Sequence, residues 1–140
     1  MLRRTEKGVS LMSEITMKKE RPKHLDLRVI KLPLPGFASI LHRISGAGLF
    51  LMMPFLLYLF ELSLDSELGF AMFKAVVAHP LAKLVLLGLL WAFLHHFCMG
   101  IRILLIDIGM GTELQAARAS AKAVMAVSLA LTVILGVKLW

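Results

Sequence analysis

The stretch PLAKLVLLGLLWAFLHHFCMGIRILLID, residues 80–107, is almost entirely apolar and carries no internal helix breaker. A hydrocarbon core about 30 Å thick requires roughly 20 helical residues at 1.5 Å each. Backbone polar groups in lipid must be bonded within the segment itself, which an α-helix achieves. The stretch therefore predicts a transmembrane helix, with Pro80 in its first turn, where the missing N–H is tolerated.

Two further stretches meet the same length requirement, about 37–62 and about 119–140. The predicted fold class is all-α: an integral membrane protein with three transmembrane helices that forms part of a hetero-oligomeric helical bundle. Residues 1–36 are expected to form a basic cytoplasmic segment, and residues 37–140 the membrane anchor.

Composition and charge distribution favour a membrane over nucleic acid as the partner. The chain is 59% hydrophobic, above the usual share for a soluble domain. Its net charge is +7, but nine of its 16 Lys and Arg residues precede residue 37. Arg102, Arg118 and Lys122 add positive charge at the same predicted side, so the N-terminus is expected to be cytoplasmic.

The single cysteine, Cys98, excludes an internal disulfide and a multi-cysteine metal site. Residues 1–20 contain no apolar core of a secretory signal, and three glutamates interrupt their basic character, unlike a transit peptide. A bacterial inner membrane is therefore preferred to the mitochondrial inner membrane as the location.

Ionisable side chains inside spanning segments are costly and commonly functional. Ser39, His42 and Arg43 stand at i, i+3 and i+4 and share one helical face near the cytoplasmic interface. They can act on one ligand. In the alternative, Arg43 extends to the headgroups and Ser39 caps the helix.

On the second span, His96 is a competent axial ligand for haem iron, with Gly100 one turn away on the same face. The alternative, which composition alone favours, is a histidine hydrogen-bonded between helices. His95 points about 100° away, so a second axial ligand would come from another chain. We expect His96 to lie about 16 Å deeper than Asp107. This depth would separate it by a haem's width from the level of Ser39, His42 and Arg43, where Arg43 could bind the propionates.

Three segments carry a family resemblance: RPKHLDL at 21–27, SILHRISG at 39–46, and HFCMGIR at 96–102, followed by Asp107. In order and spacing they closely resemble the cytochrome b subunits of succinate dehydrogenase, the respiratory complex II. The resemblance covers about residues 21–140. It departs at Ile103, where the family often has a second histidine.

The resemblance implies a complex in which a flavoprotein subunit oxidises succinate, an iron–sulfur subunit relays electrons, and two hydrophobic anchor subunits bind haem b and ubiquinone. It implies His96 as the axial iron ligand, with His42 and Arg43 near the haem propionates. Ser39, Arg43 and Asp107 would contribute to the quinone site. The chain has no flavin motif and is not expected to be catalytic alone.

The alternatives are a fumarate-reducing relative, a small transporter and a haem-free structural anchor. A fumarate-reducing relative would differ little in sequence. A small transporter is disfavoured because transporters place a carboxylate deep in the membrane, whereas Asp107 is at its edge. A haem-free structural anchor would tolerate an apolar residue at His96.

Overall fold

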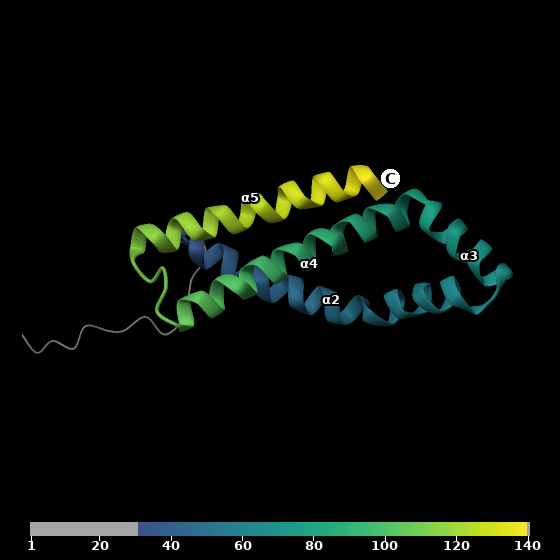
Figure 1. Ribbon diagram of the computed structural model, residues 1–140, viewed down its shortest axis with the longest axis horizontal. Coiled ribbons are helices and arrows are strands. Elements are labelled where there is room, and N and C mark those ends of the chain that lie inside the picture. Colours follow the sequence, from purple (N-terminus) through teal and green to yellow (C-terminus); the bar gives the residue numbers. More distant parts are fainter. Residues whose placement is uncertain (1–30, 140) are drawn as a thin grey trace, which may run out of the picture. The chain divides into compact units, whose positions relative to one another are not determined.

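The computed structural model describes residues 31–139, which form four α-helices and no strand (Figure 1). The predicted basic segment and the motif at 21–27 therefore lie largely outside the described residues. The helices are α2 (Leu34–Asp65), α3 (Glu67–Ala78), α4 (Pro80–Asp107) and α5 (Leu114–Leu139).

Three of these helices, α2, α4 and α5, are long and apolar enough to cross a membrane. This confirms the all-α class with three candidate spans. Helix α4 has the same bounds as the predicted span 80–107, whereas α2 extends three residues beyond 37–62 at each end and α5 begins five residues before 119. Helical hydrogen bonding does not stop where hydrocarbon ends, so residues at the interface continue the helix.

The start of α2 includes a proline and a glycine that lie before the predicted span 37–62. Pro33 is the N-terminal cap, and both Pro35 and Gly36 are already helical. A proline in the first turn forfeits no intrahelical bond because its N–H would have had no partner there. Farther along, α2 runs through Pro54 without ending.

The connection between the first two spans is itself helical, which hydropathy did not predict. Ser66 caps α3, and its Oγ accepts a hydrogen bond from the Gly69 N–H at 3.0 Å. His79 then separates α3 from α4, and its Nδ1 accepts from the Leu81 N–H at 3.3 Å. With 12 residues α3 is too short to span a bilayer, so it does not meet the length requirement from which the spans were predicted.

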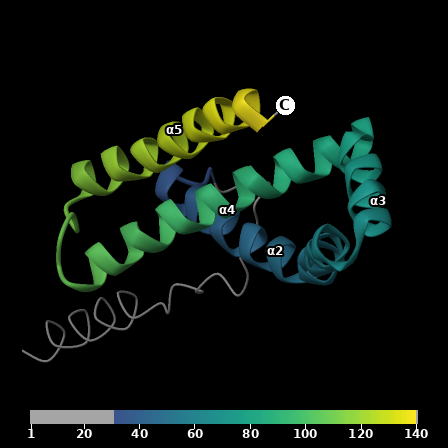
Figure 2. The same ribbon diagram turned by 45° about the vertical axis from the view of Figure 1, so that its right-hand side comes forward.

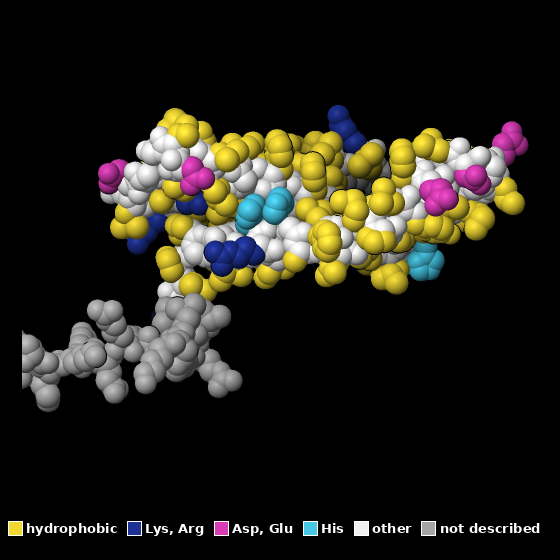
Figure 3. Space-filling model, turned by 90° about the horizontal axis from the view of Figure 1, so that it is seen from below, with side chains coloured by type: hydrophobic (Ala, Val, Ile, Leu, Met, Phe, Trp, Pro, Cys, Tyr) yellow, Lys and Arg dark blue, Asp and Glu magenta, His cyan; other side chains and the backbone are white. Residues whose placement is uncertain are grey.

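Helix α4 packs against both α2 and α5, and the three helices run alongside one another (Figure 2). Their core is small and built from Ala38, Met99, Ala121 and Val124. Large apolar side chains instead cover most of the surface (Figure 3). In a soluble protein such a surface would be unstable, whereas lipid or partner helices cover it in a membrane.

Candidate functional site

The two helices α2 and α4 meet at a pair of histidines. The imidazole rings of His42 and His96 are stacked, with centroids 4.1 Å apart and an angle of 11° between the planes. His96 Nδ1 lies 3.0 Å from the backbone carbonyl oxygen of His42. Figure 3 shows histidine side chains gathered beside a basic side chain on one face of the molecule.

Ser45 joins the same group of atoms. Its hydroxyl donates to the His42 carbonyl at 2.9 Å and lies 3.3 Å from His96 Nδ1. Because a carbonyl oxygen only accepts hydrogen bonds, the shorter contact assigns the proton to His96 Nδ1. In a neutral ring the lone pair is then on Nε2, the tautomer of a metal-binding histidine whose other nitrogen is oriented by a carbonyl.

Glycine at position 46 allows this close approach. A Cβ atom added there would lie 2.7 Å from His96 Cε1, closer than side-chain carbons pack. A Cβ at Gly48 or at Gly100, by contrast, would have no neighbour within 4 Å. Gly46 is therefore the small residue that admits the α4 histidine, and the space at Gly100, one turn from His96, is open.

The contact overturns the expected separation of His96 from His42 by the width of a haem. His42 lies eight residues after the start of α2, about 12 Å along the axis, and His96 lies eleven residues before the end of α4, about 16 Å. These helix ends belong to the same end of the antiparallel pair. The earlier start of α2 thus carries His42 almost to the level of His96.

The other predicted site residues are less closely grouped. Ser39 is half-buried one turn before His42, and Arg43 is exposed next to it, so all three lie on the predicted face of α2. Asp107 is the exposed last residue of α4. Within residues 31–139 no hydrogen bond or ion pair joins Asp107 to Ser39 or Arg43.

Sequence reasoning missed the role of Arg102 in joining α4 to α5. Its side chain is 8% exposed, Nε donates to Ser120 Oγ at 2.9 Å, and one terminal nitrogen donates to the Ala117 carbonyl at 3.1 Å. An arginine inside an apolar span was the available signal, but its partners are on a helix whose packing the sequence does not reveal. Arg102 is thus held between helices and turned away from lipid.

The neighbouring His95 faces the core and not the α2 histidine. It is fully buried and stacks on Trp91, with ring centroids 5.4 Å apart. Neither ring nitrogen has a hydrogen-bond partner. Adjacent helical residues point about 100° apart, and the two imidazoles accordingly have different neighbours.

Comparison with known proteins places these features in a family. The family model described as "Succinate dehydrogenase/Fumarate reductase transmembrane subunit" matches residues 17–135. A protein of Coxiella burnetii (strain RSA 493 / Nine Mile phase I) is 37% identical over 125 residues, covering 89% of this chain and all of the relative. One from Paracoccus denitrificans is 33% identical over 114 residues, covering 81% and 88%. Both are named succinate dehydrogenase cytochrome b556 subunit.

Proposed function

The chain belongs to the family of succinate dehydrogenase cytochrome b membrane subunits, and we propose that His96 is an axial ligand of haem b and that α2 contributes to the ubiquinone-reduction site. The observation that carries the proposal is the hydrogen bond between His96 Nδ1 and the His42 carbonyl. With Nδ1 bonded to this carbonyl, Nε2 is the ring atom that would bind the metal.

The donor set agrees with an iron that is already held by a macrocycle. Among residues 31–139 no group of three or more His, Cys, Asp or Glu side chains lies close enough to hold a metal ion. A haem iron would need only axial ligands from protein, and His96 would supply one. His95 faces the core, so a second ligand would come from the partner anchor subunit.

Two side chains on α2 complete the haem-binding part of the proposal. His42 stacks on the ligand ring and restricts its rotation. Arg43 is exposed on the same face, and its guanidinium offers the forked donor geometry that carboxylates such as haem propionates accept. Bound there, the haem would exchange single electrons within the complex.

The quinone-binding part of the proposal involves Ser39, Arg43 and Asp107. Reduction of ubiquinone takes two electrons and two protons, so a quinone carbonyl needs hydrogen-bond donors and a path for protons. The Ser39 hydroxyl can donate, and Arg43 can stabilise negative charge that develops on the ring oxygen. Asp107 would assist proton transfer from the polar end of α4, where it is exposed.

The proposal also covers the partner subunits and the orientation of the chain in the membrane. The chain would anchor the iron–sulfur and flavoprotein subunits through a hetero-oligomeric bundle in the bacterial inner membrane. Electrons would arrive from the iron–sulfur subunit. The N-terminus would be cytoplasmic, because Arg118 and Lys122 lie at the end where α2 begins and α4 ends.

The proposal is tested by the succinate-reduced minus oxidised optical spectrum of the purified complex. Wild type should show a b-type haem band, and His96→Leu should lose or markedly shift it. His95→Leu, which removes the adjacent buried imidazole, is the matched control and should retain the band. An unchanged band in His96→Leu would move the ligand elsewhere, and a wild type without the band would leave a haem-free anchor.

A further inference from the structure

A cavity extends from the end of the bundle that contains α3 toward the histidine pair. Its volume is about 640 Å³, and α2, α3, α4 and α5 all contribute to its walls. Leucines form most of the lining, among them Leu56, Leu87 and Leu90. Along α4 the lining extends from Lys83, 13 residues or about 20 Å before His96, to Phe93, three residues before it. The cationic end of the cavity is therefore about 20 Å from the proposed haem ligand.

Two lysines interrupt the otherwise apolar lining. Lys74 comes from α3 and Lys83 from the first turn of α4. The Lys74 ammonium lies 4.9 Å from the centroid of the Phe70 ring, a cation–π contact that positions it at the end of the bundle. An apolar cavity with two cationic groups in its lining matches an amphiphile that has a long hydrocarbon chain and an anionic head.

We propose that this cavity binds one acyl chain of an anionic phospholipid, with Lys74 and Lys83 contacting the headgroup phosphate. Lysine is a compact cation whose flexible stem can reach a phosphate from an apolar wall. The proposal needs only that the chain is embedded in a bilayer. It does not depend on haem ligation or on the quinone site.

The dimensions of the cavity favour an acyl chain over a helix of a partner subunit. A helix about 10–12 Å across has a cross-section on the order of 100 Å², so 640 Å³ would hold little more than one helical turn. On the α5 side of the cavity, α5 and α4 pack closely, because a Cβ added at Gly136 would lie 2.9 Å from Leu87 Cδ1. A flexible hydrocarbon chain occupies such a space without displacing these helices.

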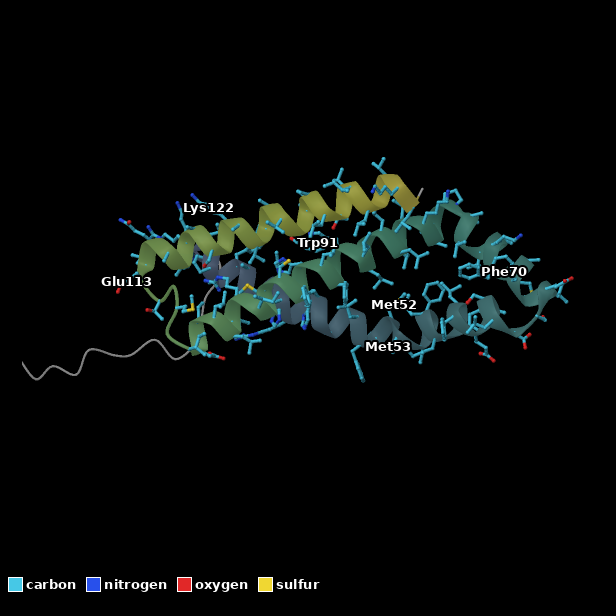
Figure 4. The ribbon with its side chains drawn as sticks, in the orientation of Figure 1. Met52, Met53, Phe70, Trp91, Glu113 and Lys122 are labelled. Carbon is cyan, nitrogen blue, oxygen red and sulfur yellow. The ribbon has the colours of Figure 1, made fainter. Side chains whose placement is uncertain are left out.

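The test is native mass spectrometry of the intact complex after exchange into detergent with defined lipid. Phosphatidylglycerol, which is anionic, is compared with phosphatidylcholine, which is zwitterionic. The double variant Lys74→Gln/Lys83→Gln removes both charges. Lys122→Gln is the matched control, because Lys122 is an exposed lysine on α5 far from Phe70 and α3 (Figure 4).

A second variant addresses the apolar part of the cavity. Ala78 lines the cavity, and Ala78→Phe fills part of the volume without changing charge. We expect wild type and Lys122→Gln to retain phosphatidylglycerol at least tenfold more than phosphatidylcholine. The double lysine variant should lose this preference, and Ala78→Phe should lower the retention of both lipids.

Three outcomes would overturn the proposal. Equal retention of both lipids by wild type would mean that the cavity does not select an anionic headgroup. Retention of phosphatidylglycerol by the double lysine variant at the wild-type level would exclude the two lysines as the headgroup site. A wild-type complex that retains no lipid would indicate that a polypeptide segment of a partner subunit occupies the cavity.

Discussion

His96 Nδ1 lies 3.0 Å from the backbone carbonyl oxygen of His42, on a different helix, and the two imidazole rings stack at 4.1 Å. The orientation of the proposed iron ligand is thus determined by main-chain and side-chain atoms of a neighbouring span. The two contributions can be separated by mutation, because only the stacking depends on the His42 side chain.

Replacing His42 by alanine should remove the stacked ring and keep the carbonyl that accepts from His96. We expect the complex to retain its b-type haem band, because the proposed iron ligand and its hydrogen bond remain. The reduction potential of the haem should change, since a ring in contact with the axial ligand is lost. Potentiometric titration of the band measures this. Complete loss of haem in His42→Ala would show that the ring itself is required for binding.

Replacing Gly46 by alanine should displace His96, because the added Cβ would be 2.7 Å from its ring. Gly48→Ala is the control, because a Cβ there meets nothing within 4 Å. Both changes raise helix propensity by about 1 kcal/mol, so they differ mainly in this contact. Haem content per complex should fall in Gly46→Ala and stay at the wild-type level in Gly48→Ala. Equal haem contents in the two variants would contradict the assignment.

Replacing Arg102 by methionine should weaken the packing of α4 against α5. The Ala117 carbonyl would lose the guanidinium donor, and Ser120 Oγ would lose the Nε donor. Loss of such charged hydrogen bonds typically costs about 1.5–3 kcal/mol. Thermal unfolding of the purified complex should occur at lower temperature than in the control Arg118→Met, which alters an exposed arginine. Equal unfolding temperatures would show that the hydrogen bonds of Arg102 to α5 contribute no stability.

Replacing Ser39 by alanine should affect the quinone and spare the haem. Loss of one hydrogen bond of about 1 kcal/mol corresponds to roughly a fivefold lower kcat/KM for ubiquinone. Succinate:ubiquinone reductase kinetics measure this effect, and the haem band serves as the internal reference. Ser63→Ala is the control, because Ser63 donates to Phe60 near the α3 end of α2. A wild-type kcat/KM in Ser39→Ala would remove Ser39 from the quinone site.

Hydropathy and length predicted the three spans because the bilayer imposes one simple requirement on each of them. The bounds of α4 followed from Pro80 and from Asp107, the carboxylate that ends the apolar stretch. Helix α3 did not follow, since a short helix at an interface has no such requirement. Its Ser66 cap is the local sequence signal of this helix start.

The candidate site was predictable in its residue types and not in its distances. Spacing placed Ser39, His42 and Arg43 on one face, because helical periodicity alone determines that. The contact between His42 and His96 depends on where α2 begins and how it lies against α4. Neither is encoded in a local pattern. The partners of Arg102 were hidden for the same reason, because they belong to the packing of α4 on α5.

The most direct test of the central claim is chemical rescue of His96→Gly in the purified complex. Removal of the side chain leaves a space in which exogenous imidazole can reach the iron. We predict that His96→Gly loses the native b-type band and that added imidazole restores it, whereas His95→Gly retains the band without imidazole. A native band in His96→Gly in the absence of imidazole would contradict ligation by His96.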